Sequence, residues 1–160
     1  MRADPIRTLA RPALTFAAAF LIAFFLFRAS DAVYAVLAAP REISLLLTAE
    51  LPAAVLLLVT ALSPFTRFCR PILAAGCVWR GASLGCLAAC LSAGRLPGIR
   101  PVGAVLPACF AALIYLCLAA ESDAAHPDLI AGGDARDHLK ASLVLAGAHF
   151  LADLALLLSK

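Results

Sequence analysis

Four ionisable residues lie within long apolar stretches of the sequence, and their types and spacing are the ones best suited to chemistry. They are Glu50, Arg80, His149 and Asp153. His149 and Asp153 are four residues apart, so on a helix their side chains meet on one face. A proton relay uses such a pair, and a polar face packed against a neighbouring helix has the same pattern. The sequence leaves both interpretations open.

Arg80 stands near the middle of the stretch AGCVWRGASLGCLAAC. A charge at the centre of a bilayer costs about 2.5 to 3.5 kcal/mol on insertion scales, and a guanidinium does not lose its proton to lower that cost. We therefore predict that Arg80 is buried within reach of an acid from another span, either Glu50 or Asp153. Such a pair either holds helices in register or forms part of a path for an ion, a proton or a substrate.

The sequence carries no recognisable catalytic or metal-binding motif. Its six cysteines contain no CxxC pair and are interpreted as small apolar packing residues. The spacing of His126, His138 and the acids between them matches no metal site, and Asp134 or Asp137 is expected to cap the last helix. HExxH, GxSxG, Walker and GxGxxG motifs are absent. We predict no metal, no cofactor and no enzymatic activity; an intramembrane enzyme built on the embedded His–Asp pair is the weaker alternative.

The elements that position these residues are predicted to be transmembrane helices. Of the 160 residues, 64% are hydrophobic and 14% are charged, and the charges cluster between apolar stretches. Because a helix needs about 20 apolar residues to cross a bilayer, five spans are expected, at 12–27, 43–62, 71–91, 101–120 and 141–158. The linkers are too short for a soluble domain. The predicted fold is all-α: one integral membrane domain over 1–160, a polytopic transmembrane bundle of about five helices.

Pro52 lies inside the second predicted span, directly after Glu50 and Leu51. One interpretation is a kinked helix with Glu50 in its interior. The other is a boundary, at which an interfacial segment gives way to a shorter span that begins near Leu51. The sequence favours neither.

The third predicted span carries a stripe of small residues. Gly81 and Gly85 are four residues apart, and Ala89 continues the spacing. Such a stripe lets two helix backbones approach closely. We therefore predict that this helix is the packing centre of the bundle.

The segment Trp79-Arg80-Gly81-Ala82-Ser83-Leu84-Gly85 resembles the basic-Gly-aromatic-Ser-Leu-Gly signature of the stage II sporulation protein M family. Leu106-Pro107, in the next helix, resembles the proline-containing fourth span of that family. The likeness covers about 71–120, with Ala82 where the family has an aromatic residue. It implies a five-helix bacterial membrane protein without catalytic chemistry that scaffolds cell-wall hydrolases during engulfment of the forespore. The positions carried over by the resemblance are Arg80, Gly81, Ser83, Gly85 and Pro107, of which the last four are assigned to helix packing.

The function expected from the sequence is therefore a membrane scaffold in the bacterial cytoplasmic membrane, with lipid and other membrane or cell-wall-associated proteins as partners. Self-association into an oligomer is compatible with the pattern. A small transporter or channel subunit, with embedded charges along a polar path, is the alternative. With a cytoplasmic N-terminus, seven basic residues flank the spans on the inner side and five on the outer side, which favours that orientation slightly. No basic patch interleaved with aromatic residues indicates nucleic-acid binding.

Overall fold

A computed structural model describes residues 5–28, 30, 43–94 and 101–158, and the side chains of 9–28, 30, 52–94 and 106–152. Within these ranges the chain forms five α-helices and one short 3-10 helix, and no strand occurs. The elements are α1 (Pro5–Phe27), α3 (Ile43–Leu62), η1 (Ser63–Phe65), α4 (Cys69–Ser92), α5 (Pro101–Ile130) and α6 (Arg136–Leu158). The all-α fold class is confirmed.

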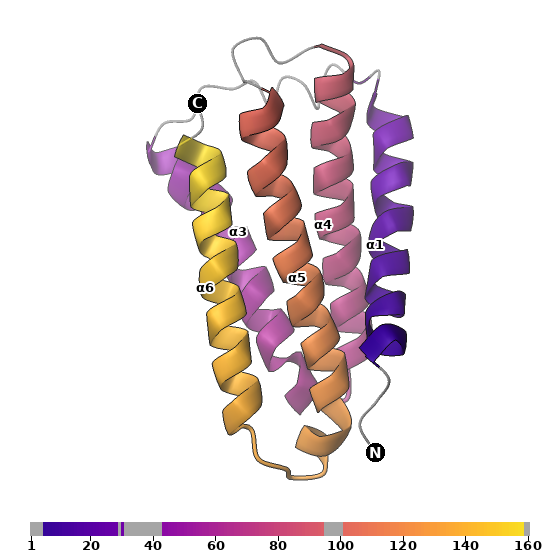
Figure 1. Cartoon of the computed structure of the whole chain (residues 1–160), viewed down its shortest axis with the longest axis vertical. Coiled ribbons are helices and arrows are strands. Elements are labelled where there is room, and N and C mark those ends of the chain that lie inside the picture. Colours follow the sequence, from indigo (N-terminus) through magenta and orange to yellow (C-terminus); the bar gives the residue numbers. More distant parts are fainter. Residues whose placement is uncertain (1–4, 29, 31–42, 95–100, 159–160) are drawn as a thin grey trace.

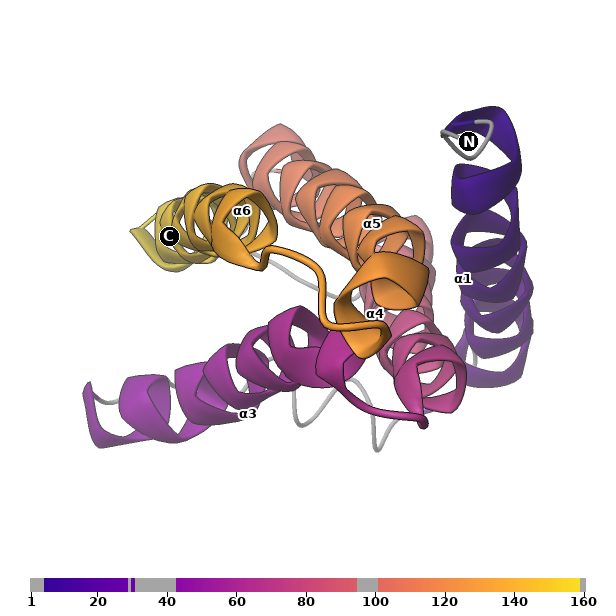
Figure 2. The same ribbon diagram turned by 90° about the horizontal axis from the view of Figure 1, so that it is seen from below.

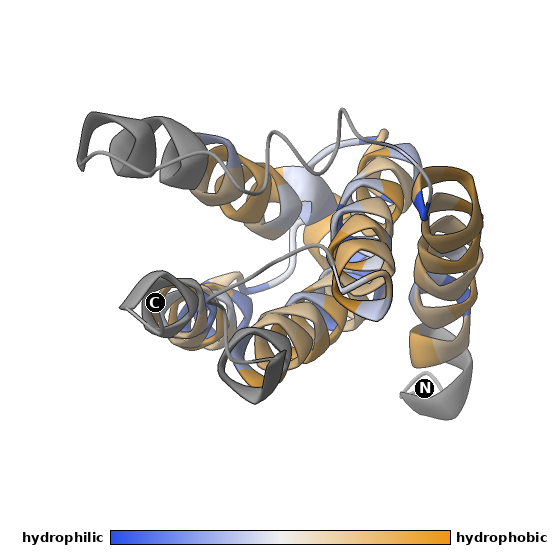
Figure 3. Ribbon diagram, turned by 90° about the horizontal axis from the view of Figure 1, so that it is seen from above, coloured by the Kyte–Doolittle hydropathy of each residue, from blue (hydrophilic) through white to orange (hydrophobic). Residues whose placement is uncertain are grey.

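Three helices of the described part are long and apolar enough to cross a membrane. These segments are Leu9–Phe27, Cys69–Ser92 and Leu106–Ile130, and Pro52–Phe65 is a shorter apolar helix. Apolar residues cover most of the described helices in Figure 3, and hydrophilic residues, drawn in blue, are limited to short stretches. Large apolar side chains point outward: Leu143 is 76% exposed and Val144 is 71% exposed. Such an exterior fits lipid rather than water. The five-span count stays a prediction.

The helices differ from the predicted spans mainly at their ends. α5 continues to Ile130, through ten residues that the sequence analysis assigned to a linker. α4 and α5 are each followed by a glycine with positive φ, Gly94 and Gly132, which ends a helix without the strain of a Cβ. The side chain of Asp134, one of the two acids predicted to cap α6, accepts a hydrogen bond from the backbone N–H of Arg136, the first residue of that helix, at 2.9 Å. α3 runs through Pro52 without interruption.

α4 lies between α1 on one side and α5 on the other (Figures 1 and 2). α5 packs against all four of the other described helices, so it is α5, and not α4 as predicted, that lies at the packing centre. α3 and α6 complete the bundle around α5. The described start of α1 and the end of α6 lie at opposite ends (Figure 1). The buried core is shared by α3, α4 and α5: Leu57, Cys69, Leu73, Cys77, Tyr115, Leu118 and Ala119.

Candidate functional site

Arg80 and His149 meet in the interior of the bundle. Nη2 of Arg80, on α4, lies 3.4 Å from Nδ1 of His149, on α6. The His149 side chain is fully buried, and Arg80 is half-buried. A guanidinium only donates hydrogen bonds, so Nδ1 accepts and the ring carries its hydrogen on Nε2. The two embedded basic residues therefore share one polar contact between α4 and α6.

Tyr115 of α5 connects this contact to α3. Its ring packs edge-on against the His149 ring, with centroids 6.4 Å apart. Its hydroxyl lies 3.1 Å from Oγ1 of Thr60, and both residues are fully buried. Gly76 makes room for that hydroxyl, because a Cβ at this position would overlap it. A line of buried polar groups thus runs from α4 through α6 and α5 to α3.

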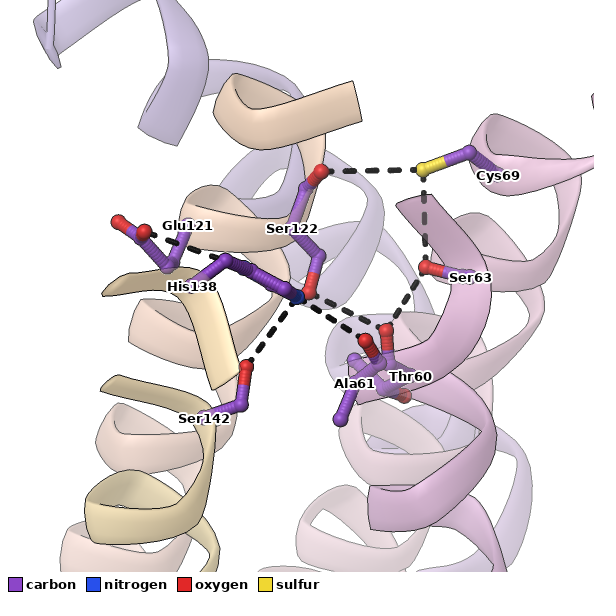
Figure 4. Close-up of polar contacts among 8 residues, drawn as sticks. All are labelled: Thr60, Ala61, Ser63, Cys69, Glu121, Ser122, His138 and Ser142. Carbon is purple, nitrogen blue, oxygen red and sulfur yellow. Dashed lines mark hydrogen bonds and ion pairs between the residues drawn. The ribbon is translucent and has the colours of Figure 1, made fainter. Parts of the chain in front are cut away.

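A second polar cluster closes the end of α3, where the helix gives way to η1 (Figure 4). The carbonyl of Thr60 accepts hydrogen bonds from Oγ of Ser63 at 2.8 Å and from Oγ of Ser122 at 3.1 Å. Sγ of Cys69 lies 3.5 Å from Oγ of Ser63 and donates to the carbonyl of Ser122 at 3.9 Å. The last carbonyls of a helix have no partner within it, so these side chains satisfy them.

Two histidines satisfy further carbonyls at the same end. Nε2 of His138 donates to the carbonyl of Ala61 at 3.0 Å, and Nδ1 of His126 donates to that of Pro64 at 2.9 Å. A carbonyl oxygen only accepts, so both named nitrogens carry hydrogens. Oγ of Ser142, 3.3 Å from Nε2 of His138, is then an acceptor of the same hydrogen. His138 thus joins α6 to the end of α3, and His126 joins α5 to η1.

The other ring nitrogen of His138 faces a carboxylate. Nδ1 lies 3.9 Å from Oε1 of Glu121, and the histidine side chain is 3% exposed while that of Glu121 is 43% exposed (Figure 4). The contact is an ion pair only when the ring is protonated. Because Nε2 carries its hydrogen in both protonation states, protonation leaves the bond to α3 intact.

The two glycines of the small-residue stripe face α1. A Cβ at Gly81 would meet the carbonyl of Phe16, and a Cβ at Gly85 would meet that of Phe20. Ser83, by contrast, is exposed, and its hydroxyl donates to the Trp79 carbonyl of its own helix at 2.8 Å. α4 and α1 therefore approach at backbone distance along the glycine stripe.

The remaining residues that the sequence singled out are placed less fully. Pro107 lies inside α5 and is half-buried. Glu50 and Asp153 belong to α3 and α6, but their side chains lie outside the described residues. The predicted pairing of Arg80 with one of these acids thus stays a prediction. Among the described residues, no group of three His, Cys, Asp or Glu side chains is arranged to hold a metal ion.

Sequence reasoning missed the cluster at the end of α3. It placed the two histidines of that cluster in a linker, whereas they belong to α5 and α6. One signal was present: Ser122 and His126 are four residues apart, and so are His138 and Ser142. On helices each pair shares a face, and such faces suit the exposed carbonyls of a neighbouring helix end.

Comparison with protein families, characterised proteins and solved structures yields no match to the chain.

Proposed function

We propose that this chain is a multi-pass, non-enzymatic protein of a bacterial cytoplasmic membrane that holds other membrane or cell-wall-associated proteins in position. One observation supports the proposal: the buried polar groups bond to one another across helix interfaces. Ser122 and His138 bind carbonyls of α3, and Arg80 contacts His149. A bundle tied in this way offers partners a surface of fixed shape.

The class of partner comes from the family resemblance. It implies that the chain positions cell-wall hydrolases during engulfment of a forespore. The resembling motif includes Gly81 and Gly85, where an added Cβ would meet backbone carbonyls of α1. Under this proposal the motif sets the position of α1 and hence the shape of the face that partners contact.

Deletion of the gene in the bacterium that encodes it tests the proposal. We expect the deletion to stop migration of the membrane around the forespore, and a tagged wild-type chain to restore it. The tagged chain, purified from solubilised membranes, should bring down a peptidoglycan hydrolase that is detected by zymography and identified by mass spectrometry. Normal engulfment in the deletion strain, with no hydrolase in the purified sample, would show the proposal to be wrong.

Two variants of the tagged chain sharpen that test. Gly81→Leu forces α1 away from α4 and should lose both complementation and the hydrolase. Gly147→Leu, on an exposed face of α6 with no atom within 4 Å of an added Cβ, should retain both. If Gly81→Leu and Gly147→Leu bring down the same amount of hydrolase, hydrolase binding does not depend on the contact between α1 and α4.

The contact between Arg80 and His149 supports a second candidate, a small transporter or channel subunit, because two ionisable groups face each other in the bundle interior. Purified protein in liposomes tests it. Ion or proton flux that Arg80→Gln abolishes, while the variant keeps the thermal stability of the wild type, would favour transport over scaffolding. Equal fluxes in protein-containing and empty liposomes would exclude it.

A further inference from the structure

A groove of ≈ 390 Å³ lies between α1, α4 and α5. Arg11 and Leu14 of α1 line it, together with Arg70, Leu73 and Cys77 of α4. Its volume falls within the range of about 300 to 1,000 Å³ that is typical of small-molecule sites. Figures 1 and 2 show the three helices as neighbours, with α1 and α4 starting at the same end of the bundle.

The groove is charged at one end and apolar beyond it. Arg70 is the second residue of α4, and Arg11 lies in the first half of α1. Leu73 and Cys77 follow Arg70 by about one and two helical turns, which places Cys77 about 10 Å deeper along the axis. On α1, Leu14 follows Arg11 by about one turn in the same direction. Because Gly81 faces Phe16 and Ala19 of α1, Arg11 lies about one turn further in than Arg70. The two arginines therefore border the outer part of the groove, and Leu14 and Cys77 lie deeper.

The charge at the mouth is only partly neutralised. Nε of Arg70 lies 3.8 Å from Oδ1 of Asp123, but the arginine side chain is 71% exposed, and such an exposed pair is weak. Arg11 is exposed and has no carboxylate of the described residues within ion-pair distance. Two arginines and one aspartate leave a net charge of +1.

This arrangement matches one class of molecule, an amphiphile with an anionic head and an apolar tail. A free phosphate would leave the apolar part of the groove uncovered, and a neutral lipid would leave the guanidinium groups without a counter-charge. We propose that the groove binds an anionic glycerophospholipid, with its phosphate at Arg11 and Arg70 and an acyl chain along Leu14, Leu73 and Cys77. The site is independent of the proposed scaffold function.

Native mass spectrometry of the full chain in detergent tests the headgroup contact. Phosphatidylglycerol should bind the wild type, and phosphatidylcholine should bind it much more weakly. In the double variant Arg11→Gln with Arg70→Gln we expect about thirtyfold weaker binding of phosphatidylglycerol, because each basic side chain near an anionic lipid contributes about fivefold. The control, Arg67→Gln with Arg136→Gln, removes the same charge from exposed positions outside the groove and should bind like the wild type.

A second pair of variants tests the acyl chain. Ala74 lines the groove, whereas the neighbouring Ala75 is exposed outside it. Ala74→Phe fills the apolar part and should weaken binding, while Ala75→Phe should not. The proposal would be overturned if phosphatidylglycerol and phosphatidylcholine bound the wild type equally well. It would also be overturned if the two arginine double variants lost the same amount of binding, or if Ala74→Phe and Ala75→Phe bound the lipid equally well. Displacement of the lipid by excess inorganic phosphate would also overturn it, because the site would then recognise a phosphate alone.

Discussion

The close approach of α1 and α4 predicts that a single added methyl group at Gly81 or Gly85 destabilises the bundle. A Cβ at Gly81 would lie 3.1 Å from Cβ of Ala19, and a Cβ at Gly85 would lie 3.0 Å from Cβ of Ala23. Ordinary contact begins at 3.4 Å, so these pairs are short by 3.4 − 3.1 = 0.3 Å and 3.4 − 3.0 = 0.4 Å. The backbone carbonyls of α1 would lie closer still. Because a backbone cannot rotate away as a side chain can, α1 itself must move.

Overpacking of this kind costs about 1 to 3 kcal/mol. Replacement of glycine by alanine in a helix also gains up to about 1 kcal/mol of helix propensity, which opposes the loss. Gly147→Ala measures that gain alone, because no atom lies within 4 Å of its added Cβ. Relative to Gly147→Ala, each of Gly81→Ala and Gly85→Ala should therefore lower the free energy of unfolding by about 1 to 3 kcal/mol. At about 2 to 4 °C per kcal/mol, the Tm should fall by roughly 2 to 12 °C.

The two glycines should also be coupled. They lie one turn apart and face the same helix, so one displacement of α1 relieves both clashes. The double variant should then cost clearly less than the sum of the single variants. Thermal unfolding followed with a thiol-reactive dye suits the measurement, since Cys77 and Cys90 are buried and become reactive on unfolding. Equal Tm values for Gly81→Ala and Gly147→Ala, or fully additive single losses, would refute the reasoning.

Three further predictions concern the buried polar contacts, each measured as a change in Tm in the same assay. Tyr115→Phe and Thr60→Val should each cost about 1 kcal/mol and be less than additive together, because they remove the same hydrogen bond; full additivity would argue against that bond. His138→Ala should cost about 1 to 3 kcal/mol by leaving a carbonyl of α3 without its donor, and His138→Gln, which keeps an N–H donor, should recover part of the loss; equal losses in the two variants would contradict this role. Arg80→Gln and His149→Gln should be coupled in a double-mutant cycle, and a coupling energy near zero would show that their contact contributes nothing.

The sequence predicted helices well because long apolar runs admit few other structures in a membrane. It predicted the end of the fourth span less well. The stretch from Glu121 to Ile130 is polar enough to resemble a linker, yet α5 continues through it. The reason is tertiary: Ser122 bonds to the carbonyl of Thr60 in α3 and His126 to that of Pro64 in η1, and a single-sequence pattern does not contain these contacts.

The partners of the embedded residues were harder to predict than their helices. Periodicity placed Arg80 beside the glycine stripe, and the structure places that stripe against α1. Periodicity gives a residue its face on its own helix, but it does not say which neighbouring helix that face meets. Charge complementarity indicates acids as partners of Arg80, and that pairing stays a prediction because the side chains of Glu50 and Asp153 lie outside the described residues. The contact of Arg80 with Nδ1 of His149 is an addition that charge complementarity does not indicate.

The bundle joins its helices in two physically different ways. α3, α4, α5 and α6 are connected by buried hydrogen bonds, whereas no hydrogen bond of the described residues connects α1 to another helix. α1 is held by close packing along Gly81 and Gly85. A small displacement of α3 therefore breaks hydrogen bonds in an apolar medium, where lost bonds are costly. A similar displacement of α1 breaks none of the described bonds and changes only van der Waals contacts. Because α1 forms one wall of the groove beside Arg11 and Arg70, that groove can adjust its width to an occupant at lower cost than the interfaces of α3 can.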